Sequence, residues 1–161
     1  MPAANRHVTT FHTPTDTQVV VRRVVDAPRD LVFEVHTSCH HLPHWMGPYG
    51  WTMSECLIEL RPGGAIRYTW TRPEGGGITI TGVVKEVVRP ELLVSTESWG
   101  PPWPEAMNRL EFSEADGQTT MVMTITYPSK EARDQALQTG MKDGMTVGYE
   151  RLERYIASLE L

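Results

Sequence analysis

Long apolar runs are missing from this chain of 161 residues, and no stretch of eighteen consecutive apolar residues occurs in it. A membrane-spanning helix needs about 20 such residues, so we expect no membrane partner. The opening stretch MPAANRHVTTFHTPT also lacks the apolar core of a secretory signal. We therefore expect a cytoplasmic protein in which residues 1–15 form a loose polar tail, ending at most in a strand, before a single domain over residues 16–161.

Basic residues are too few and too scattered to form a stripe. The chain has 15 lysines and arginines against 20 acidic residues, a net charge of −5, which argues against nucleic acid as a partner. Cysteine is scarce as well, with only Cys39 and Cys56. The two could form one bridge, but without a secretory signal we expect two free thiols in a reducing cytoplasm.

Motifs for common cofactors and nucleophiles are also absent. The sequence contains no phosphate loop, dinucleotide fingerprint or nucleophile elbow, and the glycines at 75–77 are not followed by a helical pattern. These glycines are interpreted as a hairpin turn. We expect no cofactor, and the absence of such motifs favours a binding protein over an enzyme.

Short segments of alternating polarity fill residues 52 to 127. Ile66, Tyr68 and Trp70, for example, alternate with polar residues, and glycine- or proline-rich turns separate six such segments. A period of two with short turns predicts an antiparallel sheet with one buried face. The β-branched segment at 17–25 predicts one further strand ahead of them.

Helical patterns flank this β-rich region. After the first strand, residues 28 to 37 predict a short helix, and residues 40–46 form at most a second one. From residue 129 to the end, apolar residues recur at helical spacing without any proline, which predicts one helix of roughly 45 Å. The fold class is therefore α+β, a curved antiparallel sheet of about six or seven strands wrapped around a long C-terminal helix.

Three glycines, Gly140, Gly144 and Gly148, recur every four residues on the predicted long helix. Each costs about 1 kcal/mol relative to alanine inside a helix, so the stripe needs a reason. One interpretation is close packing of the helix on the sheet, and the other is open space between them. Met141 and Met145 flank the stripe and suit either a core or an adaptable wall for apolar molecules.

Histidines are concentrated at one place, with His36, His40 and His44 spaced four residues apart. On one continuous helix they would share a face, as zinc ligands often do. Pro43 interrupts such a helix, and no accompanying carboxylate completes a motif. We expect no native metal site and interpret these histidines as surface or cavity-mouth residues.

Acid–base chemistry would need a polar group inside the apolar interior, and the candidates are His36, Glu97 and Tyr149. Glu97 shares one strand face with Ser95 and Trp99, and this face points either to solvent or into a cavity. A buried carboxylate would have a raised pKa and could act as a general acid or base. Glu97 and His36 are the two weak catalytic candidates.

Several motifs together resemble one family. These are DAPRDLVFEVHT at 26–37, HLPHWMGP at 41–48, IELRPGGAIRY at 58–68, TGVVKEVVRPELLV at 81–94 and GMKDGMTVGYERL at 140–152. In this order they are similar to activator of heat-shock-protein-ninety ATPase homologue-like domains, of the START-like, helix-grip superfamily (SRPBCC). The resemblance covers roughly residues 17 to 159. It implies a sheet around a helix with a cavity between them, on a scaffold that serves carriers, cyclases, hydrolases and co-chaperones.

The leading hypothesis for function is binding of a small hydrophobic or aromatic molecule between the sheet and the C-terminal helix. The alternatives are a co-chaperone-like stress-response protein that contacts a heat-shock chaperone ATPase, and a small hydrolase or cyclase. A homodimer through an exposed sheet edge is a further partner expectation. The predicted ligand-binding residues are Trp45, Trp51, Tyr68, Trp70, Trp99, Gly140, Met141, Gly144, Met145 and Gly148.

Overall fold

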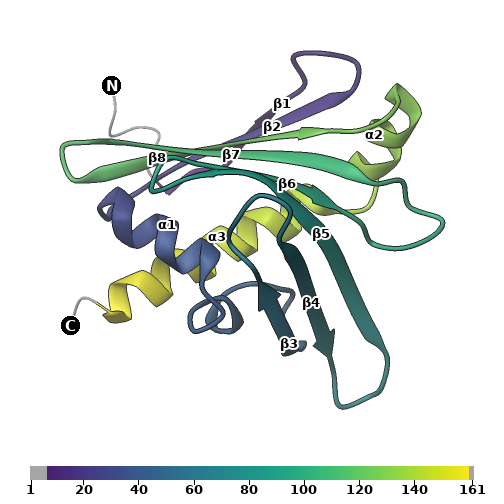
Figure 1. The fold of residues 1–161 in the computed structure, drawn as a ribbon, viewed down its shortest axis with the longest axis horizontal. Helices are drawn as coiled ribbons and strands as arrows, with labels where there is room; N and C mark the ends of the chain where they lie inside the picture. The colour runs from purple at the N-terminus through teal and green to yellow at the C-terminus, as the bar shows by residue number, and fades with distance from the viewer. Residues whose placement is uncertain (1–6, 160–161) are drawn as a thin grey trace.

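The structure is a computed structural model that describes residues 7–159, and it contains one sheet, three α-helices and one short 3-10 helix (Figure 1). Within this described part, no helix combines the length and the apolar character that crossing a membrane demands. The strands are β1 (Thr10–His12), β2 (Gln18–Val25), β3 (Thr52–Ile58), β4 (Ala65–Thr71), β5 (Gly77–Val88), β6 (Leu92–Glu97), β7 (Ala106–Ala115) and β8 (Gln118–Thr126), and the helices are α1 (Arg29–Thr37), η2 (Leu42–His44), α2 (Lys130–Leu137) and α3 (Met141–Leu159).

The sheet is antiparallel throughout, with the strand order β1-β2-β8-β7-β6-β5-β4-β3. Strands β3 to β8 form a meander, and β2 returns beside β8, so the first predicted strand pairs with the last. In Figure 1 the sheet curves around α3, with α1 beside it. The predicted α+β class is confirmed, but the sheet within residues 7–159 has eight strands instead of six or seven. The extra strand, β1, lies in the segment interpreted as a polar tail and pairs Phe11 with Val21.

The predicted long C-terminal helix is wrong in one respect, because the structure divides it into α2 and α3. Ser129 caps α2 by accepting a hydrogen bond from the backbone N–H of Ala132 at 3.0 Å. The helix ends at Leu137, and Gly140 has a φ of +81°, in the left-handed region. Glycine adopts this conformation without a Cβ penalty and commonly stops helices. The first glycine of the predicted stripe therefore separates two helices instead of lying inside one.

The core lies between the inner face of the sheet and helices α1 and α3. Val19 of β2, Phe33 of α1 and Leu152 of α3 are almost completely buried. The Phe33 ring meets the Phe112 ring edge-on, with 5.3 Å between centroids. Ile156, one turn after Leu152, is buried as well, so the C-terminal half of α3 is the part that the sheet holds most firmly.

One buried ion pair fastens α3 to the sheet. Arg23 points inward from β2, is 2% exposed, and donates hydrogen bonds from Nε and Nη2 to the two carboxylate oxygens of Glu153 at 3.1 and 3.0 Å. A third bond runs from Nη1 to the Thr9 hydroxyl at 2.7 Å. This two-pronged geometry fixes the rotation of α3 about its axis, since the planar guanidinium accepts only one orientation of the carboxylate.

A disulfide joins Cys39 to Cys56, so the expectation of two free thiols is wrong. The two Cα atoms are 5.7 Å apart, and 17 positions separate the residues in the chain. The bridge ties the segment after α1 to strand β3. Sequence alone could not show that these segments are neighbours. Disulfides are typical of oxidising compartments, which weighs against the reducing cytoplasm on which the free-thiol expectation rested.

The two glycines Gly140 and Gly148 should respond oppositely to alanine. A Cβ at Gly148 would meet no neighbouring atom within 4 Å, and the residue lies within α3. Gly148→Ala should therefore raise the free energy of unfolding by up to about 1 kcal/mol. Gly140→Ala should lower it by about 1 kcal/mol, because alanine resists a φ of +81°. Urea unfolding of both variants measures the difference, and a loss of stability in Gly148→Ala would show that this space is filled.

Removing the disulfide should destabilise the fold. Bridging a loop of about this length restricts the unfolded chain and contributes about 3 kcal/mol. The double variant Cys39→Ser/Cys56→Ser should unfold at correspondingly lower urea concentration than the oxidised wild type. Wild-type protein in excess reductant should match the double variant, whereas equal stability of oxidised and reduced wild type would contradict the bridge.

Candidate functional site

A polar cluster interrupts the apolar inner face of the sheet where β6 and β7 lie side by side. Glu97 ends β6, and Asn108 of β7 pairs with Ser95 of β6. The Asn108 amide donates from Nδ2 to Glu97 Oε1 at 2.8 Å, and the Trp99 indole donates from Nε1 to Glu97 Oε2 at 2.7 Å. Glu97 is half-buried and points inward with Ser95, so the sequence-based alternative of a purely solvent-facing strand face is not what the structure shows.

Asn108 has a buried acceptor with no partner. Its side chain is 8% exposed, and within residues 7–159 its Oδ1 receives no hydrogen bond. Because the Glu97 carboxylate accepts hydrogen bonds, the amide must turn its NH₂ group toward Glu97, which leaves the oxygen on the other side. An unpartnered buried amide oxygen costs about 1–3 kcal/mol. The inner face therefore presents one acceptor that is suited to an N–H or O–H donor.

Two tyrosines complete what we call the Glu97 cluster, defined as Tyr68, Glu97, Asn108 and Tyr127. Burial and, to a lesser extent, the negative charge of Glu97 raise the pKa of Tyr68 above its usual range, and the same two causes raise the pKa of Tyr127 to about 12. Both hydroxyls therefore stay protonated near neutral pH. Tyr127 donates to Met141 Sδ at 3.8 Å, which connects the cluster to the first residue of α3.

No other part of the described chain packs closely on the glycines of α3. Met141 and Met145 are half-buried against the core. Gly148 is half-buried and Gly144 exposed, and a Cβ added at either would meet no atom within 4 Å outside the neighbouring turns of the helix. By contrast, a Cβ at Gly82 of β5 would lie 2.1 Å from a backbone oxygen. The glycines of α3 therefore do not mark close packing of the helix on the sheet.

His36 lies apart from the Glu97 cluster, in an apolar environment. Its Nδ1 is 2.8 Å from the Val32 carbonyl oxygen, its ring packs edge-on against Trp45 and Phe112, and its buried Nε2 has no partner within residues 7–159. Desolvation lowers the pKa of His36 to about 4, and the hydrogen bond to Val32 opposes this only partly. His36 contacts Phe112, whereas Glu97 is bonded to Asn108, and these two residues of β7 are four positions, or about 13 Å, apart. The two catalytic candidates, His36 and Glu97, therefore do not form one site.

Tyr149, the third acid–base candidate, also lies elsewhere. Burial raises the pKa of Tyr149 to about 12, and the positive charge of Arg23 opposes this shift. Tyr149 is buried one helical turn before Glu153 and therefore belongs to the part of the core where the ion pair fastens α3 to the sheet.

The predicted aromatic wall separates into different environments. Trp45 and Trp70 are buried, and their indole N–H groups donate to the backbone oxygens of Val35 and Met46 at 3.0 and 3.1 Å. The Trp51 ring instead carries the guanidinium of an arginine, Arg72, 4.5 Å from its centroid. Of the predicted aromatic residues, Trp99 forms a hydrogen bond with Glu97, and the charge of Glu97 also contributes to the raised pKa of the buried Tyr68. Sequence spacing identified the inner face but could not distinguish core packing from a ligand wall.

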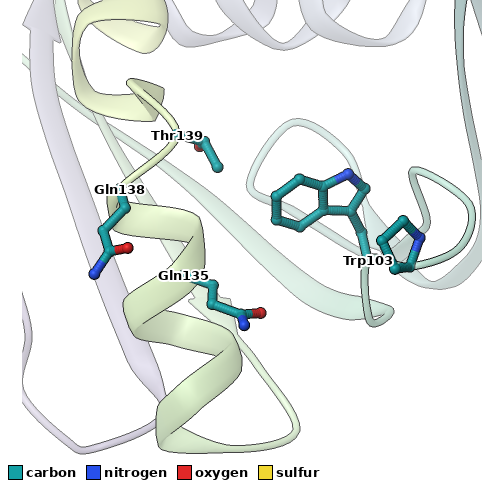
Figure 2. Close-up of a pocket in the computed structure, with 5 residues that line it drawn as sticks. Trp103, Gln135, Gln138 and Thr139 are labelled. Atoms are coloured by element: carbon teal, nitrogen blue, oxygen red, sulfur yellow. The ribbon is translucent and has the colours of Figure 1, made fainter.

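A groove of about 410 Å³ opens between the loop after β6 and the end of α2, next to the joint with α3 (Figure 2). Figure 2 shows Trp103 directed across this groove toward Gln135 and Thr139. Trp103 is 45% exposed, and Trp99 stands in the same loop. The groove is lined by Pro102, Trp103, Gln135, Gln138 and Thr139. None of the ten predicted ligand-binding residues is among them.

A second groove, of about 310 Å³, lies at the opposite end of α3. It is lined by His44, Tyr49, Arg151, Arg154 and Tyr155. Of these residues, His44 was interpreted from the sequence as a surface or cavity-mouth histidine, and none of the five was predicted to bind a ligand. Both grooves join residues far apart in the chain, so no local motif could have identified them.

The histidine series does not converge on one point. His36 is turned into the core, whereas the His44 ring stacks on Tyr155 with 5.1 Å between centroids. Among the residues that the structure describes, no group of three potential ligands could hold a metal ion.

A curved antiparallel sheet around a C-terminal helix defines the helix-grip class of SRPBCC proteins. Residues 26–157 match the family described as Activator of Hsp90 ATPase homolog 1-like protein, and the chain belongs to this family. A crystal structure of a Rhodobacter sphaeroides protein is similar at 30% identity and a TM-score of 0.90, covering 94% of this chain and 99% of that one.

More distant solved structures share the fold. A Nitrosomonas europaea protein has 22% identity and a TM-score of 0.82, covering 92% of this chain and 99% of its own. A Mycobacterium smegmatis protein has 22% identity and a TM-score of 0.80, covering 91% and 96%. No curated protein matches the sequence.

His36 should make the stability of the fold depend on pH. Its pKa is 6.5 in the unfolded chain and about 4 in the folded protein, so between these values the unfolded state binds more protons. Stability should therefore fall by about 3 kcal/mol as the pH decreases from 7 to 4. In His36→Phe, this decrease in the free energy of unfolding between pH 7 and pH 4 should be absent when urea unfolding is measured at a series of pH values. His40→Phe is the control, because that ring is not fully buried, and equal slopes in wild type and His36→Phe would contradict the assignment.

Proposed function

We propose that the protein binds a small apolar or aromatic molecule between the inner face of the sheet and the N-terminal half of α3. The observation that carries the proposal is the buried, unpartnered Asn108 Oδ1 beside Glu97. A buried acceptor without a donor is costly, and a ligand donor that bonds to it removes this cost. An apolar interior with a few convergent polar groups is also the usual composition of a small-molecule site.

The Glu97 cluster supports a particular ligand chemistry. Asn108 Oδ1 and the Glu97 carboxylate are acceptors, and the protonated Tyr68 hydroxyl is a donor. The ligand we propose is a compact aromatic or aliphatic molecule with one N–H or O–H donor, such as a phenol or an indole. Its apolar part would contact Met141 and Met145, whose flexible side chains adapt to different shapes.

The groove in Figure 2 is proposed as the entrance to this site. Its walls come from the loop that carries Trp99 and Trp103 and from the segment that ends at Gly140. Trp99 is 49% exposed and bonded to Glu97, so it connects the loop with the inner face. A flat molecule could contact the half-exposed Trp103 ring before reaching Glu97.

The two alternatives have less support. A co-chaperone role is suggested by the family description alone, and no described surface favours a chaperone partner. Catalysis by Glu97 would need a second acid–base group beside it. His36 instead packs on Phe112, which lies four residues, or about 13 Å, along β7 from Asn108. The homodimer is a proposal that no observation favours, and the Cys39–Cys56 disulfide weighs against the proposed cytoplasmic location.

Ligand binding is tested with indole and p-cresol as donor-bearing probes and toluene as a probe without a donor. We expect indole or p-cresol to raise the Tm of the wild type, since a ligand at one hundred times its Kd adds about 2.7 kcal/mol. Gly148→Leu should fill the proposed space, and Asn108→Leu should remove the acceptor. Each should weaken binding at least about tenfold in calorimetric titrations.

Met107→Leu is the matched control, because Met107 precedes Asn108 in β7 and is exposed on the outer face of the sheet. This variant should bind both probes like the wild type. Failure of both probes to bind would contradict the proposal, and so would unchanged binding in Gly148→Leu. Equal affinity for toluene would show that Asn108 does not select a donor.

A further inference from the structure

The second groove, at the C-terminal half of α3, has a chemistry unlike that of the Glu97 cluster. Its arginines, Arg151 and Arg154, come from α3, and Tyr49 comes from the segment between η2 and β3. That segment lies against α3, because Arg151 Nη1 donates to the Gly47 carbonyl oxygen and Arg154 Nη2 donates to the Tyr49 hydroxyl at 2.6 Å. The volume of about 310 Å³ is at the lower end of small-molecule sites.

Both arginines carry a charge that no carboxylate neutralises within residues 7–159. Six other arginines form ion pairs with acidic side chains: Arg23, Arg29, Arg61, Arg67, Arg109 and Arg133. Arg151 and Arg154 form none in the described part of the chain. In a protein of net charge −5, the groove therefore brings together two positively charged guanidiniums.

The two guanidiniums are held in place by hydrogen bonds and still have N–H donors available for a ligand. Each makes one side-chain hydrogen bond in the described structure, and a guanidinium has five N–H donors. Arg151 is also positioned by the Tyr49 ring, whose centroid lies 5.0 Å from its Cζ. Two oriented guanidiniums with spare donors match the paired oxygens of a phosphate or a carboxylate.

Aromatic rings form the remaining walls. The His44 ring stacks on Tyr155 with an interplanar angle of 5°, and the Tyr155 hydroxyl is 2.6 Å from His41 Nδ1. Glu34 is a carboxylate near this groove, with Oε2 3.3 Å from His41 Nε2. Burial and, to a lesser extent, the charge of Glu34 raise the pKa of Tyr155. The rings offer flat surfaces for a planar group next to the two cations.

We propose that this groove is a binding site for a small aromatic anion, in which Arg151 and Arg154 hold a phosphate or carboxylate group and the ring of the ligand packs against Tyr49 and Tyr155. This site is separate from the proposed site at the Glu97 cluster. Phosphate and carboxylate share the chemistry that the arginines recognise, and the two are distinguished by the probes.

The experiment is a titration of the full chain with phenyl phosphate and with benzoate, followed by amide NMR shifts and by calorimetry. We expect saturable binding with shifts at Gly47, Tyr49 and residues 151–155. Binding should weaken at higher salt, because the contact is ionic. Arg154→Gln should reduce affinity at least about tenfold, and Arg154→Lys should recover part of it, since lysine keeps the charge but not the two-pronged geometry.

Arg72→Gln is the matched control. Arg72 also lacks a carboxylate partner in the described structure, donates to a backbone oxygen (that of Gly75) at 2.9 Å, and packs on a ring, but on Trp51. Its substitution should change the affinity less than about twofold. Tm values for all variants separate loss of binding from loss of folding, and Arg154 makes only an exposed bond, so Arg154→Gln should fold.

Three results would overturn the proposal. These are no saturable binding of either probe, equal weakening in Arg72→Gln and Arg154→Gln, or inorganic phosphate binding as tightly as phenyl phosphate, which would exclude a role for the rings. Gly148→Leu should bind phenyl phosphate like the wild type, because it alters the other site. Failure of the anion site and failure of the proposed apolar site are thereby distinguishable.

Discussion

Burial of the C-terminal half of α3 against the inner face of the sheet is the constraint on which the other features depend. Leu152 and Ile156 supply the apolar contact, and the Arg23–Glu153 pair sets how the helix is rotated. An arginine turned into a core is stable only with its charge matched and its donors satisfied, so Glu153 cannot move far from β2. Once this half of the helix is fixed, the positions of its other residues follow from helical geometry.

The consequence is a helix with two different ends. Toward Met141, two flexible methionines pack against the core, and the Tyr127 hydroxyl connects Met141 with the Glu97 cluster. Toward Tyr155, the same helix presents two arginines to the segment before β3. The apolar half and the cationic half share one helix. The ion pair at Glu153, which lies between Arg151 and Arg154 in the sequence, therefore positions both candidate sites.

Much of the fold could be predicted from the sequence, because the hydrophobic period changes clearly from two to helical spacing at Pro128. The alternation of Ile66, Tyr68 and Trp70 correctly identified an inner face, and the resemblance to the family agreed with it. The break at Gly140 was missed, because apolar spacing continues across the joint and a glycine can lie inside a helix as well as end one. The disulfide was missed because contact between the α1–η2 segment and β3 is a tertiary fact.

The candidate sites were less predictable than the fold. Glu97 was identified because alternation placed it on a face with Ser95, but Asn108 was not, since a single polar residue in a strand gives no local signal. The grooves depend on residues distant in sequence, such as Tyr49 and Arg154, that meet only after folding. The tryptophans have different environments, which spacing alone could not show: Trp45 and Trp70 are buried, with their indole nitrogens bonded to the backbone.

The break at Gly140 allows α2 and α3 to be oriented independently. In one continuous helix, any tilt of the α2 segment would also tilt the C-terminal half that is anchored to the sheet. Two rods with a left-handed residue between them need not share an axis, and α2 has its own attachment, from Arg133 Nη1 to the Thr15 carbonyl oxygen at 2.6 Å. Substitutions in α2 can therefore change the groove shown in Figure 2 without shifting α3 on the sheet. The groove can diverge among relatives while the anchored helix keeps its position.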